Sequence, residues 1–276
     1  MGVPQSAPRE RIVDNGRVPI AVTEYGAESG GPPVVLLHGI GSRGQSWWPV
    51  IDPLAKRFHL FTLDLRGHGA SGKPASGYLL EDYAADLDAT IDRLALGQPR
   101  IVGASLGALI TLVWASERPE RAAALVLEDP SLRTQPEILG AFDGWQTLAA
   151  LPREAAAAWY KQENPDWSDE DCLRRAETIT STAPGVFAEL RTAAVDALAT
   201  GTTDRLAILS GITSPTLLLH GNPERGGMVH PEDAERLVQL MPRAQKVYVA
   251  KAGHHLHREA SDEFLAAVIP FLDGDG

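Results

Sequence analysis

The pattern Gly-x-Ser-x-Gly occupies residues 103–107, where a short apolar run ends and a helical pattern begins. A sharp turn between strand and helix holds its central residue in a strained backbone conformation, and glycines two positions on either side let the two elements approach. Such a turn exposes the Ser105 hydroxyl at the carboxyl edge of a parallel sheet, where ligands bind in open α/β folds. It also directs the free N–H groups of the following helix at the same point. The pattern therefore predicts a nucleophilic serine.

A serine hydroxyl needs two further groups before it acts as a nucleophile. These are an imidazole that accepts its proton and an acceptor that holds this imidazole in the correct tautomer. Three histidines, His254, His255 and His257, are crowded after the last apolar run of the chain. A metal site is the competing interpretation, but the sequence has no carboxylate or cysteine cluster beside them, so we expect no bound metal. One of the three is the expected general base.

Short apolar runs rich in β-branched residues, bounded by Gly, Pro and Asp, predict buried strands of a mostly parallel sheet. Residues 82–96 and 106–117 have helical patterns, so strands and helices alternate along the chain. This alternation predicts an α/β protein with a doubly wound sheet, preceded by a hairpin around Asn15-Gly16. The predicted strands are 33–38, 58–64, 100–103, 123–128, 215–220 and 245–250.

The alternation stops between residues 131 and 205, where several alanine-rich helical segments follow one another. We interpret this segment as a helical cap inserted into an α/β core that is formed by residues 1–130 and 206–276. A Ser168-Asp171 capping pattern is expected to open one of its helices. Its aromatic residues, Trp145 and Trp159 among them, either line a substrate pocket or pack the cap against the core. The two tryptophans are therefore candidate substrate-binding residues.

Three further motifs accompany the serine motif in a fixed order. Residues 38–41 read His-Gly-Ile-Gly, residues 64–71 read Asp-Leu-Arg-Gly-His-Gly-Ala-Ser, and residues 252–254 read Ala-Gly-His. Together with residues 103–107 they resemble the motifs of the α/β-hydrolase superfamily, and the resemblance covers nearly the whole chain. The chain is most similar in pattern to serine hydrolases of the esterase and lipase type that carry a helical cap.

This resemblance implies a role for each motif. His254 corresponds to the general base, and the backbone N–H groups of Ile40 and Leu106 correspond to an oxyanion hole. Losing one donor of such a hole typically costs about 3 kcal/mol of transition-state stabilisation. Trp47 follows the oxyanion loop and either forms the floor of the pocket or packs the loop. His38 and His68 are interpreted as residues that shape the loops by hydrogen bonds. No cofactor is implied.

Two carboxylates compete for the role of the catalytic acid. In the family the acid usually lies a few residues past the strand represented by 215–220, and Glu224 occupies that place. The loop 222–228 is longer than the common form, however, and carries Gly226-Gly227 where an aspartate is expected. Asp129, at the end of strand 123–128, matches a position that some family members use instead. We prefer Glu224 and keep Asp129 as the alternative.

A serine at the turn favours acyl chemistry. Family members that attack epoxides or carbon–halogen bonds use a carboxylate there, because water can open the resulting ester, whereas Ser105 would form an ether. We therefore expect hydrolysis of a carboxylic ester of a small, rather apolar substrate through an acyl-enzyme. The same triad also serves lactonases, carbon–carbon bond hydrolases and cofactor-free perhydrolases. The fold also serves as a ligand receptor with little turnover.

The composition limits the domain organisation, the partners and the location that we expect for this protein. The 276 residues, 44% of them apolar, suffice for one main domain with an insertion. The formal net charge of −11 argues against nucleic acid and anionic membranes as partners. Cys172 is the only cysteine, which excludes an internal disulfide. Because the sequence has neither a signal pattern nor a membrane-length apolar run, we expect a cytoplasmic protein acting on a small-molecule ester. Its oligomeric state is left open.

Overall fold

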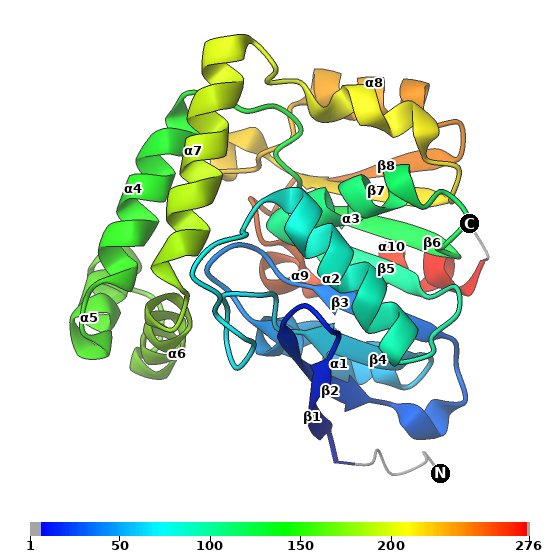
Figure 1. Cartoon of the computed structure of the whole chain (residues 1–276), viewed down its shortest axis with the longest axis horizontal. Helices are drawn as coiled ribbons and strands as arrows, with labels where there is room; N and C mark the ends of the chain where they lie inside the picture. Colours follow the sequence, from blue (N-terminus) through cyan, green and yellow to red (C-terminus); the bar gives the residue numbers. More distant parts are fainter. Residues whose placement is uncertain (1–6, 275–276) are drawn as a thin grey trace.

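Eight strands form one sheet in the computed structural model, which describes residues 7–274 (Figure 1). Residues 1–6 and 275–276, the outermost parts of the predicted core segments, lie outside the described residues. The strands lie side by side in the order β1-β2-β4-β3-β5-β6-β7-β8. Their bounds are β1 Arg9–Asp14, β2 Pro19–Tyr25, β3 Pro33–Leu37, β4 His59–Leu63, β5 Arg100–Ala104, β6 Ala124–Glu128, β7 Thr216–Gly221 and β8 Ala244–Val249.

The sheet is parallel from β4 to β8 and antiparallel at its β1-β2-β4 edge. Every strand predicted from an apolar run is present, with ends within one residue of the prediction. The leading hairpin also forms, because the Asn15 side-chain oxygen accepts hydrogen bonds from the N–H groups of Arg17 and Val18, both at 2.9 Å. The predicted α/β class and doubly wound sheet are therefore confirmed.

Helices cover both faces of the sheet, and alternate residues of each strand pack against one face or the other. Val35 and Leu37 belong to the core beneath α2, α3 and α8, whereas Val34 and Leu36 belong to the core beneath α1, α9 and α10. All four are fully buried, and each such burial contributes about 1.5–3 kcal/mol. These helices are α1 Trp48–Ala55, α2 Leu80–Arg93, α3 Leu106–Glu117, α8 Pro231–Leu240, α9 Leu256–Glu259 and α10 Ser261–Asp273.

Four helices lie between β6 and β7 in the chain and form a layer beside one end of the sheet (Figure 1). We call them the helical insertion; they are α4 Glu137–Ala149, α5 Arg153–Glu163, α6 Asp169–Thr180 and α7 Pro184–Thr200. Helix α6 begins as predicted, with the Ser168 hydroxyl accepting a hydrogen bond from the Asp171 N–H at 3.0 Å. None of the helices in residues 7–274 is long and apolar enough to cross a membrane. That the insertion acts as a cap, with limits at 131 and 205, stays a prediction.

Candidate active site

Ser105 lies at the turn between β5 and α3, with φ 51° and ψ −112°. A positive φ is strained for a residue with a side chain and costs about 1–3 kcal/mol. The neighbouring strand holds the turn in place, because the Ser105 N–H donates to the Glu128 carbonyl at the end of β6 at 2.8 Å. The serine therefore stands at the carboxyl edge of the sheet, where its motif predicted it.

Two glycines make this turn sterically possible. A Cβ atom on Gly103 would lie 2.4 Å from the Gly107 carbonyl oxygen, and a Cβ atom on Gly107 would lie 2.2 Å from the Leu37 carbonyl oxygen. Both distances are well below van der Waals contact. Strand and helix approach this closely only because the two residues lack side chains.

The loop at residues 38–41 lies against the serine. A Cβ atom on Gly39 would lie 3.3 Å from the Ser105 Cβ. Leu106 opens α3, so its N–H has no partner within the helix. In residues 7–274 no hydrogen bond of the Ile40 N–H is found either. Ile40 and Leu106 line the same cavity as Ser105, so the two residues expected to form the oxyanion hole border the cavity of the serine.

His38 and His68 hold this loop. The Gly41 N–H donates to His68 Nε2 at 3.2 Å, the Leu65 N–H donates to His38 Nε2 at 3.0 Å, and His38 Nδ1 donates to the Gly39 carbonyl at 2.7 Å. Burial lowers the pKa of His38 to about 4 and the pKa of His68 to about 3. Both rings are therefore neutral at pH 7, and they shape the loop by hydrogen bonds as expected.

The imidazole of His254 contacts the carboxylate of Asp129. His254 Nδ1 lies 2.7 Å from Asp129 Oδ2, and the carboxylate also accepts hydrogen bonds from the N–H groups of Gly221, Met228 and Val229 at 2.7–3.3 Å. Asp129 is fully buried, and these donors offset the cost of removing its charge from water. With its proton on Nδ1, His254 keeps Nε2 available as an acceptor.

The structure reverses the sequence-based preference for Glu224. This residue is exposed on the short 3₁₀ helix η4 (Pro223–Arg225), and within the described residues no hydrogen bond or ion pair of its carboxylate is found. Asp129 has φ 44°, which turns the chain sharply after β6. A Cβ atom on Gly221 would lie 1.8 Å from the Gly253 carbonyl oxygen, so the histidine loop sits directly against the end of β7. The chain then carries Glu224 past this contact to the surface.

Two carboxylates outside the predicted site residues hold the histidine loop. Glu259 accepts hydrogen bonds from the N–H groups of Gly253 and His255, at 2.6 and 3.0 Å, on both sides of the histidine. Glu128, fully buried at the end of β6, accepts from the His257 N–H at 3.1 Å and lies 2.8 Å from its Nδ1. A charged residue ending an otherwise apolar strand was the available signal for Glu128.

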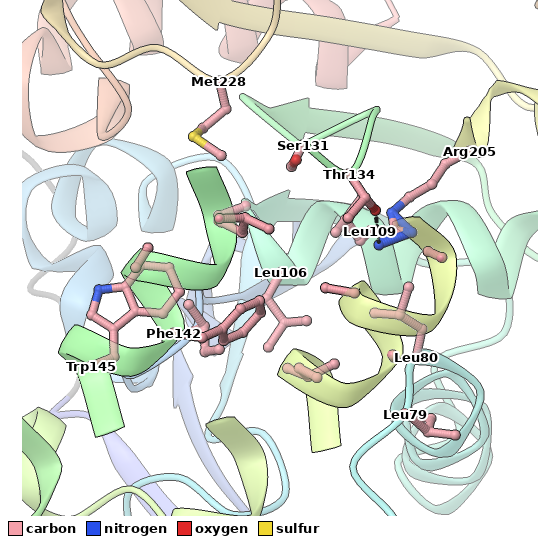
Figure 2. Close-up of a pocket in the computed structure, with 18 of the residues that line it drawn as sticks. Leu79, Leu80, Leu106, Leu109, Ser131, Thr134, Phe142, Trp145, Arg205 and Met228 are labelled. Carbon is pink, nitrogen blue, oxygen red and sulfur yellow. Dashed lines mark hydrogen bonds between the residues drawn. The ribbon is translucent and has the colours of Figure 1, made fainter. Parts of the chain in front are cut away.

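A cavity of about 410 Å³ opens beside the serine, between the sheet edge and the helical insertion. This volume suits a small-molecule substrate. Ser105 and His254 both line it, and most of the remaining wall is apolar (Figure 2). The other lining residues are Ile40, Leu79, Leu80, Glu81, Leu106, Leu109, Ser131, Thr134, Ile138, Ala141, Phe142, Trp145, Leu190, Ala193, Ala194, Ala197, Arg205 and Met228.

Of the three tryptophans that are candidate substrate-binding residues, the structure brings Trp145 to this cavity (Figure 2). Trp47 is instead fully buried in the core beneath α1 and α10, with its ring centroid 4.3 Å from that of His257. Trp159 lies on α5 and is 41% exposed. Trp47 therefore takes the packing role that the sequence left open for it, and the candidate role in substrate binding is corrected for Trp159, which does not line the cavity.

Arg205 contributes a guanidinium group to this mostly apolar wall (Figure 2). It is the first residue of the 3₁₀ helix η3 (Arg205–Gly211). Its Nη2 donates to Thr134 Oγ1 at 3.3 Å, while its Nε is buried and has no hydrogen-bond partner in the described part of the chain. Burial lowers the pKa of Arg205, and the charge of Glu81 opposes this shift. No sequence motif marks this residue, since it is a lone arginine.

Comparison with known proteins agrees with this architecture. A family model described as alpha/beta hydrolase fold matches residues 32–261, so the chain belongs to the α/β hydrolase family and is a hydrolase. It is 30% identical over 268 residues to the 2-(acetamidomethylene)succinate hydrolase of Mesorhizobium japonicum, covering 95% of each chain. It is also 29% identical over 275 residues to the 2-hydroxy-6-oxo-2,4-heptadienoate hydrolase of Pseudomonas putida, again covering 95% of each.

A solved structure extends the likeness to the backbone. The crystal structure of E-2-(acetamidomethylene)succinate hydrolase has a TM-score of 0.81 with this chain at 26% sequence identity. The match covers 97% of this chain and 100% of that chain. The family membership and the hydrolase class expected from the four motifs are thereby confirmed.

Proposed function

We propose that the protein is a serine hydrolase that cleaves carboxylic ester bonds of small substrates through an acyl-enzyme intermediate. One observation supports the proposal most strongly. Ser105, on its strained turn, and His254, which is paired with Asp129, line the same cavity. The apolar remainder of this wall supports a substrate with an apolar acyl or alcohol part. The helical insertion acts as the cap beneath which this substrate enters.

The residues perform the reaction in two halves. His254 Nε2 accepts the proton of the Ser105 hydroxyl while its Oγ attacks the substrate carbonyl, and Asp129 stabilises the imidazolium that forms. The N–H groups of Ile40 and Leu106 stabilise the oxyanion of the tetrahedral intermediate. The alcohol leaves with the proton from His254. A water molecule, activated by the same imidazole, then attacks the acyl group and releases Ser105.

A second candidate is cleavage of a carbon–carbon bond in a carboxylate substrate by the same residues. Arg205 favours it, because such a hydrolase needs a cationic group for the substrate carboxylate. One relative is named a 2-hydroxy-6-oxo-2,4-heptadienoate hydrolase. A screen of methyl and 4-nitrophenyl esters against dienone acids separates the two: faster turnover of the esters supports ester hydrolysis, and faster turnover of the dienone acids supports the second candidate.

Labelling with a fluorophosphonate tests the proposed nucleophile. Intact-mass measurement should find one adduct on the wild-type protein and none on Ser105→Ala, because the reagent reacts with an activated serine. Ser131→Ala is the matched control, since this second serine of the cavity wall has no histidine beside it in the proposed mechanism, and its adduct should be retained. An adduct that persists on Ser105→Ala would refute the assignment.

A further inference from the structure

Arg205 is held firmly at the junction between the sheet and the helical insertion. Its N–H donates to the Leu132 carbonyl at 3.1 Å, and the Thr134 N–H donates to the Thr203 carbonyl at 2.9 Å. The two segments also pair as an isolated β-bridge. Because Arg205 and Thr134 lie on segments that are tied together, the backbone positions from which their side chains meet are fixed before any ligand arrives.

Two acidic side chains at this junction already have other partners: Asp204, which precedes Arg205 in the chain, and Asp233, the partner of the bridge residue Arg133. Asp204 pairs with Arg236 at 3.0 Å, and Asp233 pairs with Arg133 at 2.6 Å. Among residues 7–274 no carboxylate lies within ion-pair distance of Arg205 itself. The fold thus leaves this one guanidinium group facing the cavity with a single weak hydrogen bond.

Glu81 is the carboxylate that lines the same cavity. Its side chain is exposed, and it acts on Arg205 through its charge without forming an ion pair. An exposed carboxylate is screened by water and counterions, so it does not replace a direct partner. The buried Nε of Arg205 remains without an acceptor among the described residues.

A guanidinium group keeps its charge in proteins, and a charge that is removed from water requires a counterion with good hydrogen-bond geometry. The planar fork of arginine matches a carboxylate through two parallel hydrogen bonds. We infer that Arg205, with the Thr134 hydroxyl beside it, binds a carboxylate group of the substrate. This inference rests on the proposed function, because it names the substrate class of the same cavity.

The surface between the two groups defines the rest of the substrate. Leu109 follows Ser105 by four residues, which is one turn of α3, and lies beside the Thr134–Arg205 pair (Figure 2). A molecule that reaches from the serine to the guanidinium group therefore crosses an apolar surface. The substrate class is a monoester of a dicarboxylic acid, in which a short aliphatic spacer separates the ester carbonyl from a free carboxylate.

The kinetic test compares two esters that differ only in charge. Monomethyl succinate, glutarate and adipate are each paired with the methyl ester in which a neutral primary amide replaces the free carboxylate, and kcat/KM is measured from methanol release. The wild-type protein should prefer the carboxylate at the best spacer length. Arg205→Met should reduce this preference by about 30-fold or more, because the ligand charge loses its buried partner. Arg205→Lys, which keeps the charge and loses the fork, should retain part of it.

Arg133→Met is the matched control for these variants. Arg133 belongs to the same bridge, but its side chain pairs with Asp233 and does not line the cavity. Its preference for the carboxylate ester should equal that of the wild type. An unchanged preference in Arg205→Met, an equal loss in Arg133→Met, or a wild-type protein that prefers the amide esters would each overturn the inference.

A second readout separates this inference from the proposed function. Glutarate should inhibit the hydrolysis of 4-nitrophenyl butyrate by the wild type competitively, and the inhibition constant should rise by about 30-fold or more in Arg205→Met. Equal inhibition of both proteins would contradict the carboxylate site while leaving Ser105 in its role. Hydrolysis of 4-nitrophenyl butyrate by Ser105→Ala would instead contradict the proposed function.

Discussion

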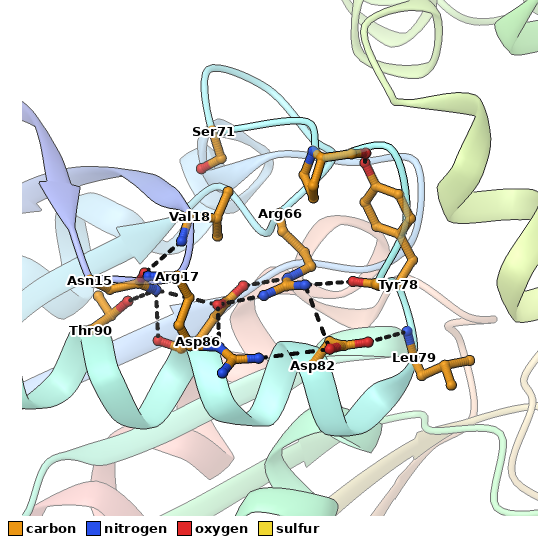
Figure 3. Close-up of polar contacts among 12 residues, drawn as sticks. Asn15, Arg17, Val18, Arg66, Ser71, Tyr78, Leu79, Asp82, Asp86 and Thr90 are labelled. Atoms are coloured by element: carbon orange, nitrogen blue, oxygen red, sulfur yellow. Dashed lines mark hydrogen bonds and ion pairs between the residues drawn. The ribbon is translucent and has the colours of Figure 1, made fainter.

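Arg66 and Arg205 both carry a guanidinium group that is partly or fully removed from water. The protein supplies a carboxylate partner to Arg66 but not to Arg205. Arg66 Nε and Nη2 donate to the two carboxylate oxygens of Asp86 at 2.5 and 2.7 Å, and Nη1 donates to the Gly77 carbonyl at 2.6 Å (Figure 3). Burial by itself lowers the pKa of Arg66, but Asp86 raises it above the ordinary value. Arg205 has the 3.3 Å hydrogen bond to Thr134, and its pKa is lowered.

The surroundings of the two arginines explain the difference. Around Arg66, the side chains of Asn15 and Arg17 each contact the Asp86 carboxylate and join the leading hairpin to α2 (Figure 3). Around Arg205 the neighbouring surface belongs to the cavity of Ser105. A polar network in which every charged group has a protein partner stabilises the fold; we call the network around Arg66 the closed region. A charged group without such a partner on a cavity wall is available to a ligand, and we call the surroundings of Arg205 the open region. Substitutions in the two regions should therefore have opposite consequences for stability and for activity.

The largest effect is expected at the proposed catalytic acid, the buried partner of His254 on the cavity wall. Asp129→Asn should lower kcat for 4-nitrophenyl butyrate by about 10⁴-fold, or about 5.5 kcal/mol, because His254 loses the acceptor that fixes its tautomer. Glu224→Gln, the control, should change kcat little because that side chain is exposed. A large loss in Glu224→Gln with little loss in Asp129→Asn would restore the original preference.

Substitutions in the closed region around Arg66 should change the free energy of unfolding and not the activity. Asp86→Asn removes the partner of a buried arginine and should lower the free energy of unfolding by about 3–5 kcal/mol, measured by urea denaturation. The kcat/KM of the folded variant should stay unchanged. Asp92→Asn, which breaks the exposed pair with Arg121, is the matched control and should cost at most about 1 kcal/mol. Similar losses in the two variants would contradict the assignment of the Arg66–Asp86 pair to the fold.

His38 and His68, whose hydrogen bonds hold the loop at residues 38–41, predict a pH dependence of stability. As the pH falls below 6.5, the unfolded chain binds protons that folded His38 and His68 do not take up until about pH 4 and about pH 3. Stability is therefore present above pH 6.5 and is lost below it, at about 1.4 kcal/mol per pH unit for each ring.

A substitution measures the share of one ring in this loss. Between pH 7 and pH 5, His68→Gln should lose about 2 kcal/mol less unfolding free energy than the wild type does, because one titrating group is gone. Urea denaturation at the two pH values gives both losses. Equal losses would mean that the His68 ring is protonated in the folded protein, against its buried contact with Gly41.

The smallest expected effect compares the two arginines directly. Arg205→Met should leave the free energy of unfolding unchanged or raise it by about 1 kcal/mol, because the variant no longer holds an uncompensated charge against an apolar wall. Arg66→Met should lower it by about 3 kcal/mol, since Asp86 is left buried without its partner. A comparable loss in both variants would make Arg205 a structural residue like Arg66.

Most of the fold was predictable from the sequence, because a buried parallel strand is a continuous apolar run that turn residues delimit. Residues 100–103 and 215–220 illustrate this, since their predicted ends differ from β5 and β7 by one residue at most. Ser105 was predictable for a similar reason. Its strained turn requires glycines two positions before and after the serine, and these glycines are visible in the sequence.

The rest of the site depends on contacts between distant segments. Asp129 and Glu224 both follow strands that end at the same sheet edge, and the choice between them depends on the positive φ of Asp129 and the packing of Gly221 on Gly253. Neither feature has a local pattern in the sequence. Arg205 is distinguished by the partner that it lacks, and a missing partner becomes visible only when the three-dimensional neighbours are known.

The central claim is that a ligand carboxylate pairs with the guanidinium group of Arg205, as the Asp86 carboxylate pairs with that of Arg66. Its most direct test is urea denaturation of Ser105→Ala, which retains the cavity, with and without glutarate; the neutral diamide of glutaric acid is the control ligand. At a concentration 100-fold above its dissociation constant, glutarate should raise the free energy of unfolding by about 2.7 kcal/mol. The diamide should have no effect, and Ser105→Ala/Arg205→Met should not respond to glutarate. No rise in Ser105→Ala, or an equal rise in the double variant, would contradict the account.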